Sequence, residues 1–259
     1  DETQLMGVGV TTSAQLQGFR EKLNVFGNAQ TVWMSATLDA KILATVDHPR
    51  PEDGWRTEKL KEEDFANPKI QQLINAEKPC RRAETVLTKD NQGDFNPLAK
   101  EVLQAHKPKQ LTLVVVNSVE RAQGLFAAIK ALGDQQEQPP KTCLIRSRGR
   151  PKERGPTQQQ ALSEGNRPDG GRIIVATQAI EAGVDLSATT LFTELAPWSS
   201  LVQRFGRCNR RGTCGKTGSP KSDVVWIDID THENTDKNLP LPYSVEELDQ
   251  ARSHIIEMT

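Results

Sequence analysis

The residues best suited to chemistry are Arg204, Arg207 and Arg210, in the stretch QRFGRCNRRG at 203–212. They recur every three residues, so a helix would carry them as a slowly drifting stripe with Gln203 beside it. Guanidinium groups are planar donors that fit phosphate oxygens, and an arginine supplied by a neighbouring domain accelerates phosphoryl transfer by about 10³- to 10⁵-fold. An isolated basic cluster is more often a solvated face, so the surrounding sequence has to decide.

A second stretch, IIVATQAIEAGVDL at 173–186, predicts where a ligand would lie. Its β-branched beginning is typical of a buried parallel strand, and ligands of open α/β sheets collect at the carboxyl ends of such strands. We therefore expect Thr177 and Gln178 to contact nucleic-acid phosphates, and Gly183 and Asp185 to lie near a nucleotide ribose. The alternatives are a helix cap at Thr177 and an ordinary turn at 183–185.

The order of these stretches resembles a known family. ATQAIEAGVDL, then a strand, then ELAPWSSLVQRFGRCNRRG is similar to motifs V and VI of superfamily 2 helicases, and QRFGRCNRRG looks like the CRISPR-associated helicase-nuclease of type I interference systems. Other motifs of this superfamily have counterparts along nearly the whole chain. Asp1-Glu2-Thr3-Gln4 is similar to Walker B, Ser35-Ala36-Thr37 follows an apolar run like the coupling motif, and Asn117-Ser118 follows the apolar run 111–116 like motif IV.

The resemblance implies an ATP-dependent motor that moves along single-stranded DNA after a guide-RNA surveillance complex recruits it. Asp1 would then hold Mg²⁺ through water and Glu2 would orient or deprotonate the attacking water. Gln203, Arg207 and Arg210 would stabilise the γ-phosphate of ATP, and Arg204 would bind the nucleotide with Gly183 and Asp185. Coupling of the two motor domains would fall to Ser35, Ala36 and Thr37, and DNA contacts to Asn117, Ser118, Arg146, Arg148, Thr177 and Gln178.

The chain also departs from the family pattern. No stretch satisfies GxxxxGK[ST], because the Gly215-Lys216-Thr217 tripeptide has Arg210 where the first glycine should stand. We expect the phosphate loop, and most of the first motor domain, to lie upstream of residue 1, so that this segment alone lacks appreciable ATPase activity. The paired His-Asp metal site of the family's nuclease domain is also absent from the sequence.

Composition places few further limits on function. With 259 residues, 36% hydrophobic and 26% charged, the chain is an ordinary α/β protein, and it has neither a long apolar run nor a leader, which favours a cytoplasmic protein without a membrane partner. The four cysteines form no CxxC pair, so we expect free thiols rather than a zinc site.

The net charge of −1 hides a basic cluster at 141–155, in which Arg146 and Arg148 could grip a phosphate backbone. The alternative for this cluster is a flexible solvated loop. Aromatic residues that could stack on bases are sparse, so we expect tracking of the backbone without sequence readout.

Alternating helix and strand patterns predict a RecA-like parallel sheet with helices on both faces. We divide the chain into a remnant of the first motor domain (1–40), an interdomain connection (41–93), the second motor domain (94–230) and an acidic extension with a helix beginning at Ser244 (231–259). Expected helices lie at 13–25, 67–77, 96–106, 118–132, 157–164 and 199–209, and strands at 31–35, 111–116, 142–146, 172–176, 190–194 and 223–229.

Two other functions remain open from the sequence. The arginines could serve a non-catalytic nucleic-acid-binding module, as a surface that only grips phosphates. The chain could also belong to a different superfamily 2 motor, such as a restriction-type translocase. The form of the QRFGRCNRRG stretch and the Asp-Glu-x-Gln opening argue against the latter.

Overall fold

The computed structural model divides the chain into two compact units, residues 1–64 and 65–259. It describes residues 6, 8–24, 27, 29–34, 40–89, 93–145, 168–181, 184–216, 218–231 and 239–258. Several predictions fall outside these ranges: the site residues Asp1, Glu2, Ser35, Ala36, Thr37, Arg146, Arg148 and Gly183, and the helix at 157–164.

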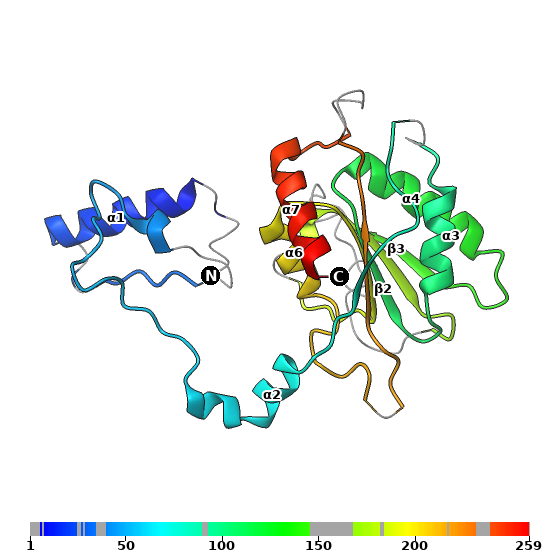
Figure 1. Ribbon diagram of the computed structural model, residues 1–259, viewed down its shortest axis with the longest axis horizontal. Helices are drawn as coiled ribbons and strands as arrows, with labels where there is room; N and C mark the ends of the chain where they lie inside the picture. The colour runs from blue at the N-terminus through cyan, green and yellow to red at the C-terminus, as the bar shows by residue number, and fades with distance from the viewer. Residues whose placement is uncertain are drawn as a thin grey trace. The chain divides into compact units, whose positions relative to one another are not determined.

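The second unit is built on a parallel sheet with the strand order β1-β6-β5-β2-β4-β3 (Figure 1). Every residue of β2, β4 and β5 is buried, as expected for central parallel strands. The predicted RecA-like parallel sheet is confirmed, and strands β2 to β6 lie within two residues of the predicted positions. Their bounds are β1 (Cys80–Arg82), β2 (Leu111–Val115), β3 (Lys141–Ile145), β4 (Arg172–Ala176), β5 (Thr190–Glu194) and β6 (Asp223–Ile227).

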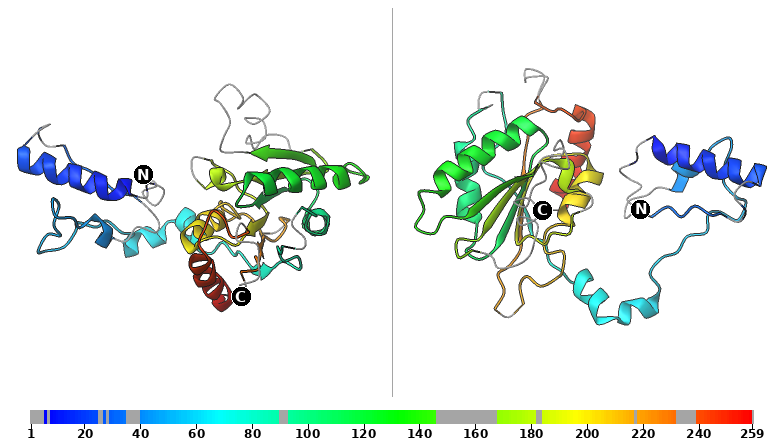
Figure 2. Two further views of the ribbon diagram at one scale, coloured as in Figure 1. Left: turned by 90° about the horizontal axis from the view of Figure 1, so that it is seen from above. Right: turned by 180° about the vertical axis from the view of Figure 1, so that it is seen from behind.

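One face of this sheet is covered by α3 (Asn96–Ala105), α4 (Val119–Gly133) and α7 (Val245–Met258), whose apolar residues share one buried cluster with it. The views in Figure 2 agree that α3 lies beside α4. Helix α6 (Trp198–Phe205) adds Leu201 to the same cluster. On the opposite face, the described cover comes from Ile180 of the 3-10 helix η4 (Gln178–Ile180) and from Leu186, Ala188 and Cys208.

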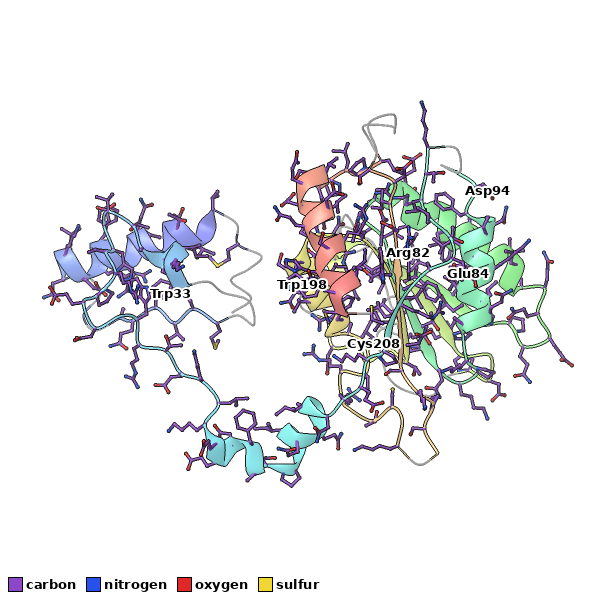
Figure 3. All side chains as sticks on the ribbon, in the orientation of Figure 1. Trp33, Arg82, Glu84, Asp94, Trp198 and Cys208 are labelled. Carbon is purple, nitrogen blue, oxygen red and sulfur yellow. The ribbon has the colours of Figure 1, made fainter. Side chains whose placement is uncertain are left out.

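The C-terminal helix α7 is part of the core of this unit. Leu248, Ala251 and Ile255 on its inner side are all fully buried. Ser244 caps the helix as predicted: the Glu247 backbone N–H donates to its hydroxyl at 3.3 Å, and the Glu247 carboxylate accepts from the Ser244 backbone N–H at 3.0 Å. Figure 3 labels Trp198 on α6, whose ring lies 5.5 Å from that of His254 on α7.

Strand β1 was not predicted, and it lies inside the expected interdomain connection. It pairs in parallel with β6, and Leu87 forms a further bridge with Ile229. Three residues that include Arg81 and Arg82 carry no apolar pattern, so nothing in the sequence identifies this edge strand. The second unit begins at residue 65 and also contains α2 (Pro68–Ile74).

The first unit contains α1 (Gly9–Leu23) and the 3-10 helix η2 (Ala40–Leu43), while a further 3-10 helix, η3 (Glu62–Ala66), spans the division between the units. The large apolar side chains of α1 lie outside this unit's core: Leu16, Phe19 and Leu23 are 49%, 44% and 68% exposed. The helix instead buries a side of small residues that includes Gly18, where a Cβ would lie 2.1 Å from the Asp47 carbonyl oxygen.

Trp33 completes the small core of this unit. Its indole N–H donates to the Ser13 hydroxyl at 2.7 Å (Figure 3). The described residues 31–34 do not form the strand predicted at 31–35. Among the helices that the structure describes, none is long and apolar enough to cross a membrane.

Candidate nucleotide and nucleic-acid site

The carboxyl ends of β2, β4 and β5 meet at one edge of the sheet, because β2 lies between the other two and all three run parallel. Asn117 joins these ends. Its backbone N–H donates to the Glu194 carboxylate at 2.8 Å, and its side-chain amide donates to the Leu195 carbonyl at 2.7 Å. The Gln178 amide donates to the Asn117 carbonyl at 2.8 Å. The predicted nucleic-acid residues of two strand ends therefore lie together.

Two of these predicted DNA contacts are buried in the structure. Asn117 is 3% exposed and Thr177 is 1% exposed, so neither side chain is available to a phosphate in this conformation. Asn117 instead holds neighbouring strand ends. The alternative of a capping role for Thr177 is not seen either, since its hydroxyl makes no cap hydrogen bond to η4 and has no partner among the described residues.

Ser118 and Gln178 are the less buried members of this group. The Ser118 hydroxyl accepts from the backbone N–H of Arg121 at 3.1 Å and caps α4. Gln178 begins η4 and is half-buried.

Arg204 lies inside the domain, which does not agree with the predicted contact with nucleotide. Its guanidinium is fully buried and its Nε pairs with the Glu181 carboxylate at 2.8 Å. Its remaining nitrogens donate to Thr193 Oγ1 (3.3 Å), the Glu194 carbonyl (3.0 Å), Asn117 Oδ1 (3.0 Å) and the Tyr243 hydroxyl (3.4 Å). Five hydrogen bonds to four elements or segments make this arginine a structural link, because a buried charge requires such partners.

A second buried pair continues this polar cluster. Glu194 is fully buried and lies 2.9 Å from Arg121, whose guanidinium also donates to the carbonyls of Leu239 and Leu241 at 3.0 and 3.1 Å. Burial raises the pKa of Glu194, while Arg121, the Asn117 N–H and Arg204 act in the opposite direction. The cluster thus fastens the segment before α7 to α4 and to the end of β5.

Sequence reasoning singled out neither acid of these pairs. Glu181 lies inside the ATQAIEAGVDL stretch and Glu194 at the end of a predicted strand, so both acids belong to segments that the sequence identifies. Arg204, the partner of Glu181, lies 23 residues away along the chain, and Arg121, the partner of Glu194, lies 73 residues away. Only the fold brings these charges together.

The expected stripe of arginines on one helix is wrong. Helix α6 ends at Phe205, four residues before the predicted end at 209. The chain then turns: the Ala188 N–H donates to the Arg207 carbonyl, and the Asn209 N–H donates to the Ala188 carbonyl, both at 2.8 Å. Asn209, three residues beyond the C-cap residue Gly206, has a φ of 43°, a left-handed conformation that Asn tolerates.

Arg207 lies just beyond this helix end and is 3% exposed. Its two terminal nitrogens donate to the carbonyls of Glu181 and Val184, each at 2.5 Å. Both carbonyls belong to the chain that follows β4. Arg207 therefore holds the two predicted motifs together at the level of the backbone.

Arg210 is the most accessible arginine of the three. Its side chain is 45% exposed and its Nε lies 3.1 Å from Asp185 Oδ1, while Arg211 lies 3.7 Å from Asp185 Oδ2. Asp185 itself is 71% exposed. Exposed pairs of this kind contribute about 0–1 kcal/mol, so a bound phosphate could replace the Asp185 carboxylate at little cost. Gln203 is half-buried, and within the described ranges its side chain makes no hydrogen bond.

All four cysteines are free, and one of them packs at this turn. Burial raises the pKa of Cys208 to about 12, and its thiol lies near the carbonyls of Thr189 and Asp223. Cys208 acts as a small apolar side chain in the turn that follows α6.

Residues 108–213 match the family described as CRISPR-associated nuclease/helicase Cas3, C-terminal. This range contains every predicted site residue that lies in the part of the chain the structure describes. We call this part of the chain the Cas3-like domain, because it resembles the C-terminal part of those proteins.

Curated relatives carry the same name. The Cas3 nuclease/helicase of Haloferax volcanii is 48% identical over 61 residues, which is 24% of this chain and 6% of the relative. The Cas3 helicase of Thermoproteus tenax is 30% identical over 116 residues, 44% of this chain and 18% of the relative. The chain thus spans less than a fifth of the length of these relatives.

Solved structures agree on the fold of the Cas3-like domain. The crystal structure of T. fusca Cas3 with ADP has a TM-score of 0.57 and 22% identity, covering 70% of this chain and 22% of that protein. The structure named for AMPPNP has a TM-score of 0.54 over the same share. At this identity the likeness establishes the fold alone.

Proposed function

We propose that the Cas3-like domain is the second motor domain of an ATP-dependent DNA helicase or translocase that acts in CRISPR interference. The observation that supports this most directly is the contact between the two motifs: Arg207 bonds to the backbone at Glu181 and Val184, and Arg210 pairs with Asp185. The chain that follows β4 thus lies between the strand ends and the arginines. A motor needs such a link between nucleic acid and nucleotide.

ATP would bind this site through Arg210, and Arg207, which is 3% exposed and bonded to two carbonyls, would join it once those bonds rearrange. Arg210 presents an exposed guanidinium beside a weakly held carboxylate, and Arg207 lies three residues before it. Planar guanidinium groups bind phosphate oxygens in two-point contacts and would stabilise charge on the γ-phosphate, with Gln203 assisting. Arg204 keeps a structural role. That relatives of the same fold carry ADP and AMPPNP in their names favours nucleotide binding here.

The remaining roles follow the family resemblance. Asp1 would hold Mg²⁺, which neutralises charge on the phosphates, and Glu2 would orient the attacking water. Gly183 would lie beside the nucleotide, and Ser35, Ala36 and Thr37 would couple this domain to a first motor domain. Single-stranded DNA would lie along the edge marked by Ser118 and Gln178, with Arg146 and Arg148 on its backbone, and a guide-RNA surveillance complex would recruit the motor in the cytoplasm.

The decisive experiment replaces the accessible arginine in the full-length protein that carries this chain. Arg210→Ala should lower DNA-stimulated ATP hydrolysis by about 10³-fold or more, while affinity for single-stranded DNA stays within about threefold. Arg207→Ala should have the same effect on hydrolysis. Arg211→Ala is the matched control, since Arg211 is adjacent and its side chain is 50% exposed.

The competing function predicts a different result. If the domain is a nucleic-acid-binding module, Arg210→Ala should weaken DNA binding and reduce its salt dependence, because fewer counterions are released. Hydrolysis would then be unchanged. Arg210→Ala would also abolish hydrolysis in a restriction-type translocase, so this variant does not distinguish it from a Cas3 motor. Stimulation of the ATPase by a guide-RNA complex bound to its target does, because a restriction-type translocase would not respond to that complex.

A further inference from the structure

Glu181 is the residue on which both arginines of the QRFGR sequence converge. Its carboxylate accepts from Arg204 Nε at 2.8 Å through Oε1 and from the Ser200 hydroxyl at 3.2 Å through Oε2. Its backbone carbonyl accepts from Arg207 at 2.5 Å. The residue is 3% exposed. Its side chain and its main chain thus bind two different arginines, one structural and one expected at the nucleotide.

Glu181 is also tied to the nucleic-acid edge of the sheet. It follows η4 directly, and its backbone N–H donates to the Gln178 carbonyl at 3.0 Å. Gln178 in turn donates to the Asn117 carbonyl at 2.8 Å. One short turn of 3-10 helix therefore separates Glu181 from the strand ends of β2 and β4.

We propose that Glu181 is a positioning residue that sets Arg207 and couples it to Gln178 at the nucleic-acid edge. This inference rests on the proposed function. The buried ion pair with Arg204 holds the Glu181 side chain, and hence its carbonyl, against α6. The carbonyl then orients the guanidinium of Arg207. A displacement of η4 by DNA would be passed to Arg207, and misplacement of a catalytic group by about 1 Å can cost about 10²-fold in rate.

The test is a double-mutant cycle in the full-length protein, with ATP and single-stranded DNA. Glu181→Gln removes the charge that holds Arg204, and we expect the DNA-stimulated kcat to fall about 10- to 100-fold while KM for ATP changes less than about threefold. Arg207→Lys cannot span both carbonyls and should lower kcat on its own. In the Arg207→Lys background, Glu181→Gln should have no further effect on kcat. Additive losses would overturn the proposal.

Loss of stability is controlled with a second buried acid. Asp228 is 5% exposed and pairs with Arg252 at 2.9 Å and with Arg82 at 2.6 Å. These residues lie outside the stretches 173–186 and 203–212. Asp228→Asn should also lower the melting temperature, because Arg252 (21% exposed) and Arg82 (53% exposed) lose their shared carboxylate, but it should leave kcat unchanged at a temperature where the protein is folded. If Asp228→Asn lowers kcat as much as Glu181→Gln does, Glu181 is merely structural.

A milder variant serves if Glu181→Gln does not fold. Ser200→Ala removes one hydrogen bond to the Glu181 carboxylate and exposes no charge. We expect kcat to fall by about threefold, again with no further effect beside Arg207→Lys; no change in kcat, or an additive one, would contradict the proposal. If instead the proposed function is wrong, Arg210→Ala would leave ATP hydrolysis intact, regardless of the effect of Glu181→Gln.

Discussion

At the level of single residues, one motif places its arginines in three environments. Arg204 is fully buried, Arg207 is almost buried and bonded to carbonyls, and Arg210 is half exposed in a surface pair. Equal spacing predicted one stripe, which would have required α6 to continue beyond Phe205. Which arginine turns inward depends on acceptors that come from other elements. Spacing within the motif carries no information about them.

These environments predict different costs for the same substitution. Arg204→Ala leaves the Glu181 carboxylate buried without its partner, so it should lower the free energy of unfolding by about 3–5 kcal/mol. Arg210→Ala removes an exposed pair and should cost about 0–1 kcal/mol. Urea unfolding of the two variants measures both values. Equal losses would mean that the Arg204 network does not stabilise the domain.

At the level of elements, sequence patterns predicted the central sheet well and its margins poorly. Strands β2 and β4 are nearly continuous apolar runs, because both of their faces are buried, and β5 is buried as well although it contains Thr190, Thr193 and Glu194. Edge strand β1 has only three residues and carries two arginines, so its pairing with β6 depends on tertiary contacts alone. Helix α6 stops at Phe205, before the predicted end, and the Arg207 carbonyl and Asn209 N–H beyond it bond to Ala188.

His106 joins elements at the amino ends of the strands, at the opposite end of the sheet from the candidate site. It follows the last residue of α3, and its Nε2 lies 2.8 Å from the Gly170 carbonyl, which can only accept, so this nitrogen carries the proton. Its Nδ1 then accepts from the Thr112 hydroxyl at 2.8 Å. Burial lowers the pKa of His106, with the Gly170 hydrogen bond acting against that shift.

The lowered pKa gives a pH dependence with a definite sign. Between the folded pKa of His106 and the unfolded value of about 6.5, the unfolded chain binds more protons, so stability rises with pH. The stabilisation is complete above about pH 6.5 and is lost as the pH falls below it. The free energy of unfolding, measured from pH 5 to 7.5, should have a smaller slope in His106→Gln, which keeps an N–H donor but does not titrate. An unchanged slope would assign the pH dependence to other groups.

At the level of the whole molecule, the two units differ in how complete their cores are. The second unit buries a continuous core on its sheet, whereas the described core of the first unit consists of Val10, Ala14 and Leu43 with Trp33 and Trp55 packed against it. That residues 1–40 are a remnant of another motor domain stays a prediction. The sequence did not predict the division at 64, because the residues on either side of it share the same polar composition.

Activity of this chain on its own tests the division of labour between motor domains. The Gly215-Lys216-Thr217 tripeptide does not replace a phosphate loop, since the Lys216 ammonium donates to the Gln72 side chain at 2.8 Å. No other stretch of the sequence resembles GxxxxGK[ST]. Arg207 and Arg210 would act on charge that develops in the transition state, and they cannot replace the loop that holds ATP in the ground state.

We therefore expect the 259-residue chain to show no DNA-stimulated ATP turnover above that of its own Arg210→Ala variant. Phosphate release with single-stranded DNA and Mg²⁺ measures this, and the full-length protein serves as the positive control. Turnover by the chain that disappears in the Arg210→Ala variant would show that a complete nucleotide site lies within these residues. Arg210 would then act on a phosphate held by groups other than a phosphate loop, and the assignment of ground-state binding to a separate motor domain would fail.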